Sequence, residues 1–208
     1  LPQAQRVAKE AGAIHHVIYV NELDNEEMLN NPENRCYLCK KYLFQNLLAF
    51  AAEKGIDTIM EGNNADDLHV YRPGTKAVKE LGVLSPLAEL GITKAQVREI
   101  AADMGLSCAS RPSSPCLATR LPYGTPISFE LLERVDAGEQ WMKEQGFPIV
   151  RLRVHGDILR IEIEKERFAD FIAMSDQITA KMKELGFVYI TLDAEGFRSG
   201  SMDVHIVK

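Results

Sequence analysis

The sequence predicts an α/β protein in which a doubly wound parallel sheet is followed by a small α+β C-terminal domain. Helical and strand-like patterns alternate along the first half of the chain, which is typical of β-α-β units. Residues 107–125 then lack apolar periodicity and read as a long loop. Beyond that loop, two runs of alternating apolar and polar residues indicate a hairpin between helices. We therefore expect domains at 1–124 and 125–208.

Composition and charge exclude several classes of protein. The chain has 208 residues, 46% of them hydrophobic and 26% charged, which excludes a collagen, a coiled-coil rod and a disordered chain. The longest apolar runs are far shorter than the ~20 residues of a membrane span. The formal net charge of −6 disfavours a nucleic-acid partner, because such a protein must neutralise phosphates. The sequence starts without a signal peptide, so we expect a cytoplasmic protein that binds neither membranes nor nucleic acids.

The first domain begins with a helix pattern at 3–10, ended by Gly12, and a strand pattern at 14–20. These two elements are the second half of a β-α-β unit. We therefore expect an N-terminally incomplete fold whose first strand and the loop after it are missing. A helix at 36–54 with a broad apolar stripe and a strand at 56–60 continue the alternation.

A loop of small and acidic residues, 61–67, follows the strand at 56–60, where parallel sheets usually place ligand-binding groups. Asp66 and Asp67 in this loop suit Mg²⁺ at a nucleotide, and a plain solvated turn is the alternative. Further along lie a turn at 71–74, a short helix at 75–81, and a helix opened by the capping-box pair Thr93 and Gln96.

The expected elements of the second domain are a helix from Ser128 to about Gln145, strands at 149–154 and 158–164, a helix ended by Gly186 and a strand at 187–192. The first two strands are joined by a turn at 155–157, which predicts a hairpin. Its alternation places Arg151 and Arg153 on one face.

The cysteines form the first group of candidate site residues. Cys36 and Cys39 make a CxxC motif at a helix start, where both thiolates can reach one metal and the helix end favours them as anions. Cys116, in a polar loop, could be a third ligand. Three thiolates suit an iron–sulfur cluster with one open iron, whereas structural zinc needs a fourth ligand such as Cys108. Thiols that only pack are the third alternative.

The arginines form the second group. Arg151, Arg153 and Arg198 could together bind a phosphate or a carboxylate through paired hydrogen bonds. The alternative is a solvated hairpin face in which the arginines pair with Glu162 and Glu164.

Several runs of residues occur in the order found in one known family: 35–40 (RCYLCK), 61–67 (EGNNADD) with 71–74 (YRPG), 85–87 (SPL), 115–120 (PCLATR) with 122–124 (PYG), and 195–202 (EGFRSGSM). By these runs the chain resembles the LarE family, the ATP-dependent sulfur transferases of nickel-pincer cofactor synthesis, over essentially its whole length. The resemblance implies a PP-loop pyrophosphatase domain, of the adenine nucleotide alpha hydrolase-like type, followed by a small sulfur-transfer domain. It also implies ATP and Mg²⁺, and a small mononucleotide substrate whose carboxylates are adenylated and then thiolated.

The resemblance further implies roles for single residues. Some members give up the sulfur of one cysteine, here Cys116, whereas others hold a 4Fe-4S cluster on three cysteines. The set Cys36, Cys39 and Cys116 resembles the cluster-bearing branch, and Cys108 has no place in the motif. The implied substrate and reaction residues are Arg151, Arg153 and Arg198 for the substrate phosphate, Cys116, Glu139 and Lys40 at the reacting centre, and Asp67 on the nucleotide side. We also expect a homo-oligomer.

One departure from the family pattern is the absence of its ATP signature, a Ser-Gly-Gly-x-Asp-Ser loop after the first strand. The absence agrees with the incomplete N-terminus expected above, and a protein that begins at Leu1 should not hydrolyse ATP. Two alternatives stay open. One is a PP-loop enzyme that thiolates tRNA, which the acidic charge disfavours. The other is a non-catalytic module that binds zinc.

Overall fold

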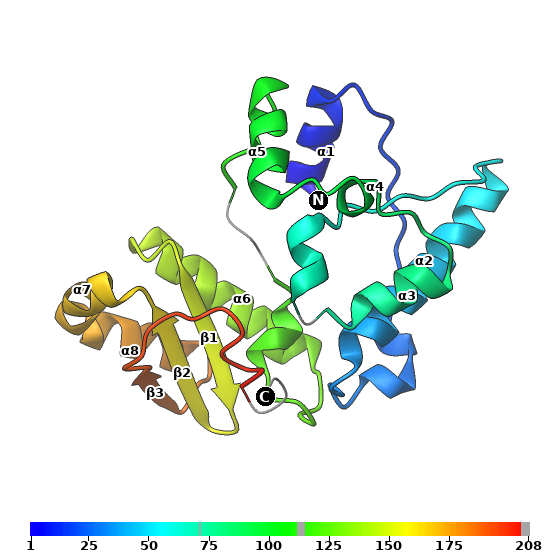
Figure 1. Cartoon of the computed structure of the whole chain (residues 1–208). Coiled ribbons are helices and arrows are strands. Elements are labelled where there is room, and N and C mark those ends of the chain that lie inside the picture. Colours follow the sequence, from blue (N-terminus) through cyan, green and yellow to red (C-terminus); the bar gives the residue numbers. More distant parts are fainter. Residues whose placement is uncertain (71, 112–114, 205–208) are drawn as a thin grey trace. The chain divides into compact units, whose positions relative to one another are not determined.

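The computed structural model describes residues 1–70, 72–111 and 115–204 (Figure 1). The chain divides into two compact units. The N-terminal unit comprises Leu1–Met28 and Asn34–Ser114, and the C-terminal unit comprises Leu29–Glu33 and Pro115–Lys208. Tyr71 of the predicted turn and positions 112–114 of the predicted loop lie outside the described residues. The functional division at 1–124 and 125–208 stays a prediction.

Helices are the main secondary structure of the N-terminal unit. They are α1 (Pro2–Glu10), η1 (Glu22–Asp24), η2 (Glu26–Met28), α2 (Arg35–Glu53), η3 (Ala65–His69), α3 (Gly74–Glu80), α4 (Pro86–Glu89) and α5 (Lys94–Asp103). The helices expected at 3–10, 36–54 and 75–81 are therefore confirmed to within a residue or two. The capping box is confirmed as well, because the Thr93 side chain accepts from Gln96 N and the Gln96 side chain accepts from Thr93 N.

The strands expected at 14–20 and 56–60 are wrong in the described part of this unit. Its only strand pairing there is one parallel bridge between Met60 and Leu84. A strand is stable only when its backbone groups bond to a neighbouring strand. Ile14 and Tyr19 are instead 87% and 90% exposed. The doubly wound parallel sheet is therefore not confirmed, although the described chain, with eight α-helices and three strands, is α/β.

The C-terminal unit is built on a three-stranded mixed sheet. Its elements are η4 (Leu117–Arg120), α6 (Phe129–Glu144), β1 (Val150–His155), β2 (Ile158–Ile163), η5 (Lys165–Arg167), α7 (Phe168–Ala173), α8 (Ser175–Glu184) and β3 (Tyr189–Leu192). The expected hairpin is confirmed: β1 and β2 are antiparallel, with Leu152 opposite Ile161. β3 returns after the helices and pairs parallel with β2, which gives the order β1-β2-β3. Ser128 caps α6 as predicted, since its side chain accepts from Leu131 N.

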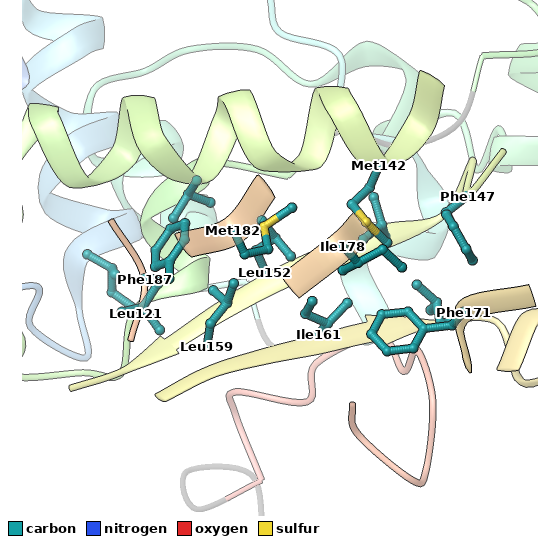
Figure 2. Close-up of a cluster of buried hydrophobic side chains, with 14 residues drawn as sticks. Leu121, Met142, Phe147, Leu152, Leu159, Ile161, Phe171, Ile178, Met182 and Phe187 are labelled. Carbon is teal, nitrogen blue, oxygen red and sulfur yellow. The ribbon is translucent and has the colours of Figure 1, made fainter. Parts of the chain in front are cut away.

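The main hydrophobic core lies in the C-terminal unit, between the sheet and helices α6, α7 and α8 (Figure 2). Period-two alternation directs Leu152 of β1 and Ile161 of β2 into it, and helical spacing adds Met142, Ile178 and Met182. These side chains are fully buried. The cluster in the N-terminal unit is smaller, with Phe44, Val78 and Val83 buried. None of the helices in the described ranges is long and apolar enough to cross a membrane.

Truncating Leu152 to Ala should lower the free energy of unfolding of the C-terminal unit by about 2–5 kcal/mol, because it removes buried methyl groups and leaves a cavity. Ile172→Ala is the matched control: Ile172 is 64% exposed, and the expected change is within about 0.5 kcal/mol. Urea unfolding followed by circular dichroism measures both. Equal losses for the two variants would contradict this description of the core.

Candidate functional site

The predicted site residues are divided between the two units. Lys40, Cys36, Cys39 and Asp67 belong to the N-terminal unit, whereas Cys116, Glu139, Arg151, Arg153 and Arg198 belong to the C-terminal unit. Within each unit, the described residues hold no group of three His, Cys, Asp or Glu side chains placed to bind a metal. The three-cysteine ligand set draws on both units, so it stays a prediction.

The CxxC motif occupies the first turns of α2. Cys36 is exposed and Cys39 is half-buried. The start of α3 packs closely against this turn: a Cβ on Gly74 would lie 3.2 Å from the Cys36 carbonyl oxygen and 3.1 Å from Cδ of Lys40. Gly74 therefore permits the close approach of α3 to the motif.

Lys40 is held by a carboxylate from the segment after the Met60 bridge. Its Nζ lies 3.0 Å from Oε2 of Glu61, and the Ser85 hydroxyl donates to Oε1 at 2.6 Å. The Glu61 side chain is only 9% exposed, which strengthens a charge-assisted bond relative to one in water. Glu61 therefore connects the CxxC helix to the two segments that form the parallel bridge.

Asp67 organises the loop that the family resemblance predicts to face the nucleotide. Its Oδ2 accepts from the backbone N and from Nδ2 of Asn64, at 3.0 and 2.8 Å, and its Oδ1 pairs with Arg72 at 2.6 Å. Asp66 accepts from the backbone N of Lys94 at 3.0 Å, at the start of α5. These bonds fix the conformation of the loop, and the Mg²⁺ site stays a prediction.

In the C-terminal unit, Glu139 forms a buried ion pair with Arg120. The contact is bidentate: Arg120 Nε donates to Oε1 at 2.7 Å and Nη2 donates to Oε2 at 2.8 Å. Oε1 also accepts from the backbone N of Leu152 at 3.0 Å. Both side chains are at most 3% exposed. Glu139 therefore ties α6 to β1 and to η4.

Arg153 forms the second buried pair. Its Nε and Nη2 donate to Oε2 of Glu162 at 3.1 and 3.0 Å, and its Nη1 donates to the Thr119 carbonyl at 2.9 Å. Arg153 is 5% exposed and Glu162 is fully buried. The alternative of a solvated hairpin face named the right partner in Glu162, but the pair is buried rather than solvated.

Glu162 is the centre of a network that sequence reasoning missed. Its Oε1 accepts from the Ser201 hydroxyl at 2.6 Å and pairs with Arg160 at 3.2 Å. Arg160 also pairs with Asp193 at 3.2 Å, and Asp193 pairs with Arg198 at 3.1 Å. A continuous chain of ion pairs therefore connects Arg153 to Arg198 and fixes the C-terminal tail.

Arg151 lies beside this network, with its guanidinium 5.3 Å from the ring centre of Phe197. The pKa of Arg151 is lowered, first by burial and then by the positive charge of Arg120. Arg153 lowers it further, while Glu139 and Glu162 oppose the shift. Burial is therefore the main cause of the shift, and the arginine and glutamate charges around Arg151 act in opposite directions.

The missed residues had a weak signal in the sequence. Alternation along β2 puts Arg160 and Glu162 on the polar face of the hairpin, but nothing local shows that loop 115–120 and the tail cover that face. The burial of Arg120 and Ser201 likewise depends on contacts between distant segments.

The fold and the site together define an α/β protein whose candidate chemistry centres on cysteines and arginines. No protein-family model matches the chain. It is 39% identical over 210 residues to an uncharacterized protein of Synechocystis sp., covering 100% of this chain and 78% of that protein. It is 35% identical over 206 residues to the pyridinium-3,5-bisthiocarboxylic acid mononucleotide synthase of Lactiplantibacillus plantarum, covering 99% of this chain and 75% of the synthase. An uncharacterized protein of Methanocaldococcus jannaschii is 31% identical over 174 residues, covering 84% of this chain and 68% of its own. The chain belongs to the family of this synthase, the LarE family.

Protonation of His155 makes the stability of the C-terminal unit depend on pH. Burial lowers the pKa of the imidazole, Arg160 and Arg153 lower it further, and Glu162 opposes them. The folded state therefore favours the neutral form. The contribution of His155 to the free energy of unfolding is fully present above the unfolded pKa of ~6.5 and is lost as the pH falls below it. We expect His155→Gln to reduce the loss of stability between about pH 7.5 and 5.5. Urea midpoints at the two pH values measure it, with the exposed His15→Gln as control. A loss in His155→Gln as large as in the parent would contradict the assignment.

Proposed function

We propose that the chain is an ATP-dependent sulfur transferase that adenylates the carboxylates of pyridinium-3,5-biscarboxylic acid mononucleotide and replaces the activated oxygen with sulfur. The observation that carries this proposal is the 35% identity, over 99% of the chain, to a protein named for the bisthiocarboxylic product. The reaction belongs to nickel-pincer cofactor synthesis.

The arginines of the C-terminal unit supply the substrate side. We assign the substrate phosphate to Arg151, Arg153 and Arg198. Ion pairs through Glu162, Arg160 and Asp193 connect Arg153 to Arg198. Arg151 supports the assignment best, because it is half-buried on the same face of β1 as Arg153. Arg153 already donates to Glu162 and to the Thr119 carbonyl, so its main effect is to hold loop 115–120 against the hairpin.

The cysteines supply the sulfur side. We propose that Cys36, Cys39 and Cys116 hold a 4Fe-4S cluster, which when bound would keep an extra sulfide on its open iron for repeated transfer. The residues fit such a group: the two thiols of α2 lie one helical turn apart, and Cys36 and Cys116 are exposed. Cys108 is left outside the ligand set.

The reaction takes place in two steps. A carboxylate oxygen of the substrate attacks the α-phosphorus of ATP, and the bond to pyrophosphate breaks as the acyl adenylate forms. A sulfur nucleophile then bonds to the acyl carbon, and AMP leaves with the former carboxylate oxygen. We assign Asp67 to the nucleotide and its Mg²⁺, through the loop that it fixes. We assign Lys40 to the negative charge that develops on the oxygen bonded to the reacting carbon.

Cys116→Ser should reduce thiocarboxylate formation to the rate measured without protein, because serine provides neither a sulfur atom nor a soft metal ligand. Cys108→Ser is the matched control and should keep the parent activity. The assay supplies the acyl adenylate of the substrate with sulfide to anaerobically purified protein, so it does not depend on ATP binding, and mass spectrometry detects the product. An active Cys116→Ser variant would contradict the proposal. Iron and acid-labile sulfide in the parent support the cluster, whereas dehydroalanine at position 116 after one turnover would contradict repeated transfer.

Arg151→Ala should weaken binding of the mononucleotide ~10–100-fold, because it removes charge-assisted hydrogen bonds to the phosphate. Arg151→Lys should recover only part of the affinity, since a point charge lacks the guanidinium fork. Arg167→Ala, on the exposed η5 turn, is the control and should bind like the parent. Isothermal titration of the mononucleotide decides the matter: parent-like affinity of Arg151→Ala would remove the arginine from the phosphate site.

A further inference from the structure

Two buried arginines hold the backbone of the turn that carries Cys116. Arg120 Nη1 donates to the carbonyls of Pro115 and Cys116, each at 3.3 Å, and to the Thr119 hydroxyl at 2.9 Å. Arg153 adds the bond to the Thr119 carbonyl at 2.9 Å. The Thr119 hydroxyl donates in turn to the Cys116 carbonyl at 2.7 Å. The Cys116 side chain is exposed, although its backbone is tied to the interior of the unit.

Glu139 lacks the features of a proton carrier. Oε1 accepts from Arg120 Nε and Leu152 N, and Oε2 accepts from Arg120 Nη2, so both oxygens are occupied. The residue is 2% exposed. A general acid or base must reach the proton that it transfers, directly or through one water. The geometry gives Glu139 a different task, which is to orient Arg120.

We propose that the Arg120–Glu139 pair is a positioning device for Cys116. The bidentate contact fixes the guanidinium plane, and the remaining Nη1 group then fixes the Cys116 carbonyl and so the direction in which the thiol leaves the backbone. This inference rests on the proposed function, in which Cys116 handles sulfur. Arg120 and Glu139 are positioning residues, because they act through the Cys116 backbone.

The test must separate positioning from a purely structural ion pair. Replacing both partners of a buried pair by neutral residues often costs little stability, whereas removing one partner leaves a buried charge. The double variant Arg120→Met, Glu139→Gln removes both charges and keeps an amide oxygen for Leu152 N, but it loses the bonds to the carbonyls of residues 115 and 116. Ile178→Val, in the core on α8, is the matched control for a general loss of stability.

Three quantities are compared in the full chain: the urea midpoint, amide hydrogen exchange of the peptide spanning 115–121, and kcat and KM with the acyl adenylate. We expect exchange of that peptide to rise ~10-fold in the double variant relative to Ile178→Val, the effect of losing one or two hydrogen bonds. We also expect kcat to fall ~10-fold or more while KM changes by less than about twofold, since the loss concerns orientation rather than binding.

Exchange and kcat equal to those of Ile178→Val would overturn the proposal. If the double variant does not fold, Arg120→Lys serves instead, because it keeps the charge beside Glu139 but cannot bond both the carboxylate and the carbonyls. Parent-like exchange and kcat in that variant would overturn the proposal equally. The exchange measurement is independent of activity. If exchange is faster in the variant but the parent shows no turnover, Arg120 holds the backbone of the Cys116 turn and the proposed function is wrong.

Discussion

Burial of charge is the constraint on which the C-terminal unit depends. Arg120, Glu139, Arg153 and Glu162 are all at most 5% exposed. Taking such groups out of water costs several kcal/mol per ion, and the cost is offset only when the geometry is good and the remaining donors and acceptors are satisfied. Here the satisfaction comes from backbone groups of residues 115–119 and 152 and from the Ser201 hydroxyl. If the loop and the tail left the hairpin, these ions would lose hydrogen-bond partners while still partly buried. The loop and the tail are therefore held against the hairpin.

The hairpin reconciles this ionic layer with an apolar core. Val150, Leu152 and Val154 of β1 are buried in the core, and the arginines between them form the other face. Loop 115–120 and the tail bond to that polar face, which is why Arg153 is buried although it lies opposite the core. One strand therefore supports hydrophobic packing on one side and charge-assisted hydrogen bonds on the other.

Local patterns predicted the elements that depend on local physics. Caps at Thr93 and Ser128, the alternation in the hairpin and the CxxC helix were all readable, because each follows from neighbouring residues. The strand at 14–20 was wrong, since a strand also requires a partner that its own residues do not encode. The sequence predicts Glu162 as a partner of the arginines. It does not predict the network around Glu162, because that network forms only when the distant C-terminal tail folds onto β2.

The contrast between Cys116 and its supports bears on how a sulfur-handling residue can work. A cysteine that handles sulfur must be reachable from solvent, which favours exposure, yet the sulfur that it holds must be delivered to the acyl carbon along a narrow range of directions. A flexible loop would satisfy the first requirement and fail the second. In this chain the side chain meets the first requirement by lying in solvent, while the Cys116 carbonyl is fixed by Arg120 and by Thr119. The turn is thus ordered when the chain folds, so its conformational entropy is not lost again each time substrate binds. A buried ion pair beneath an exposed cysteine gives this advantage.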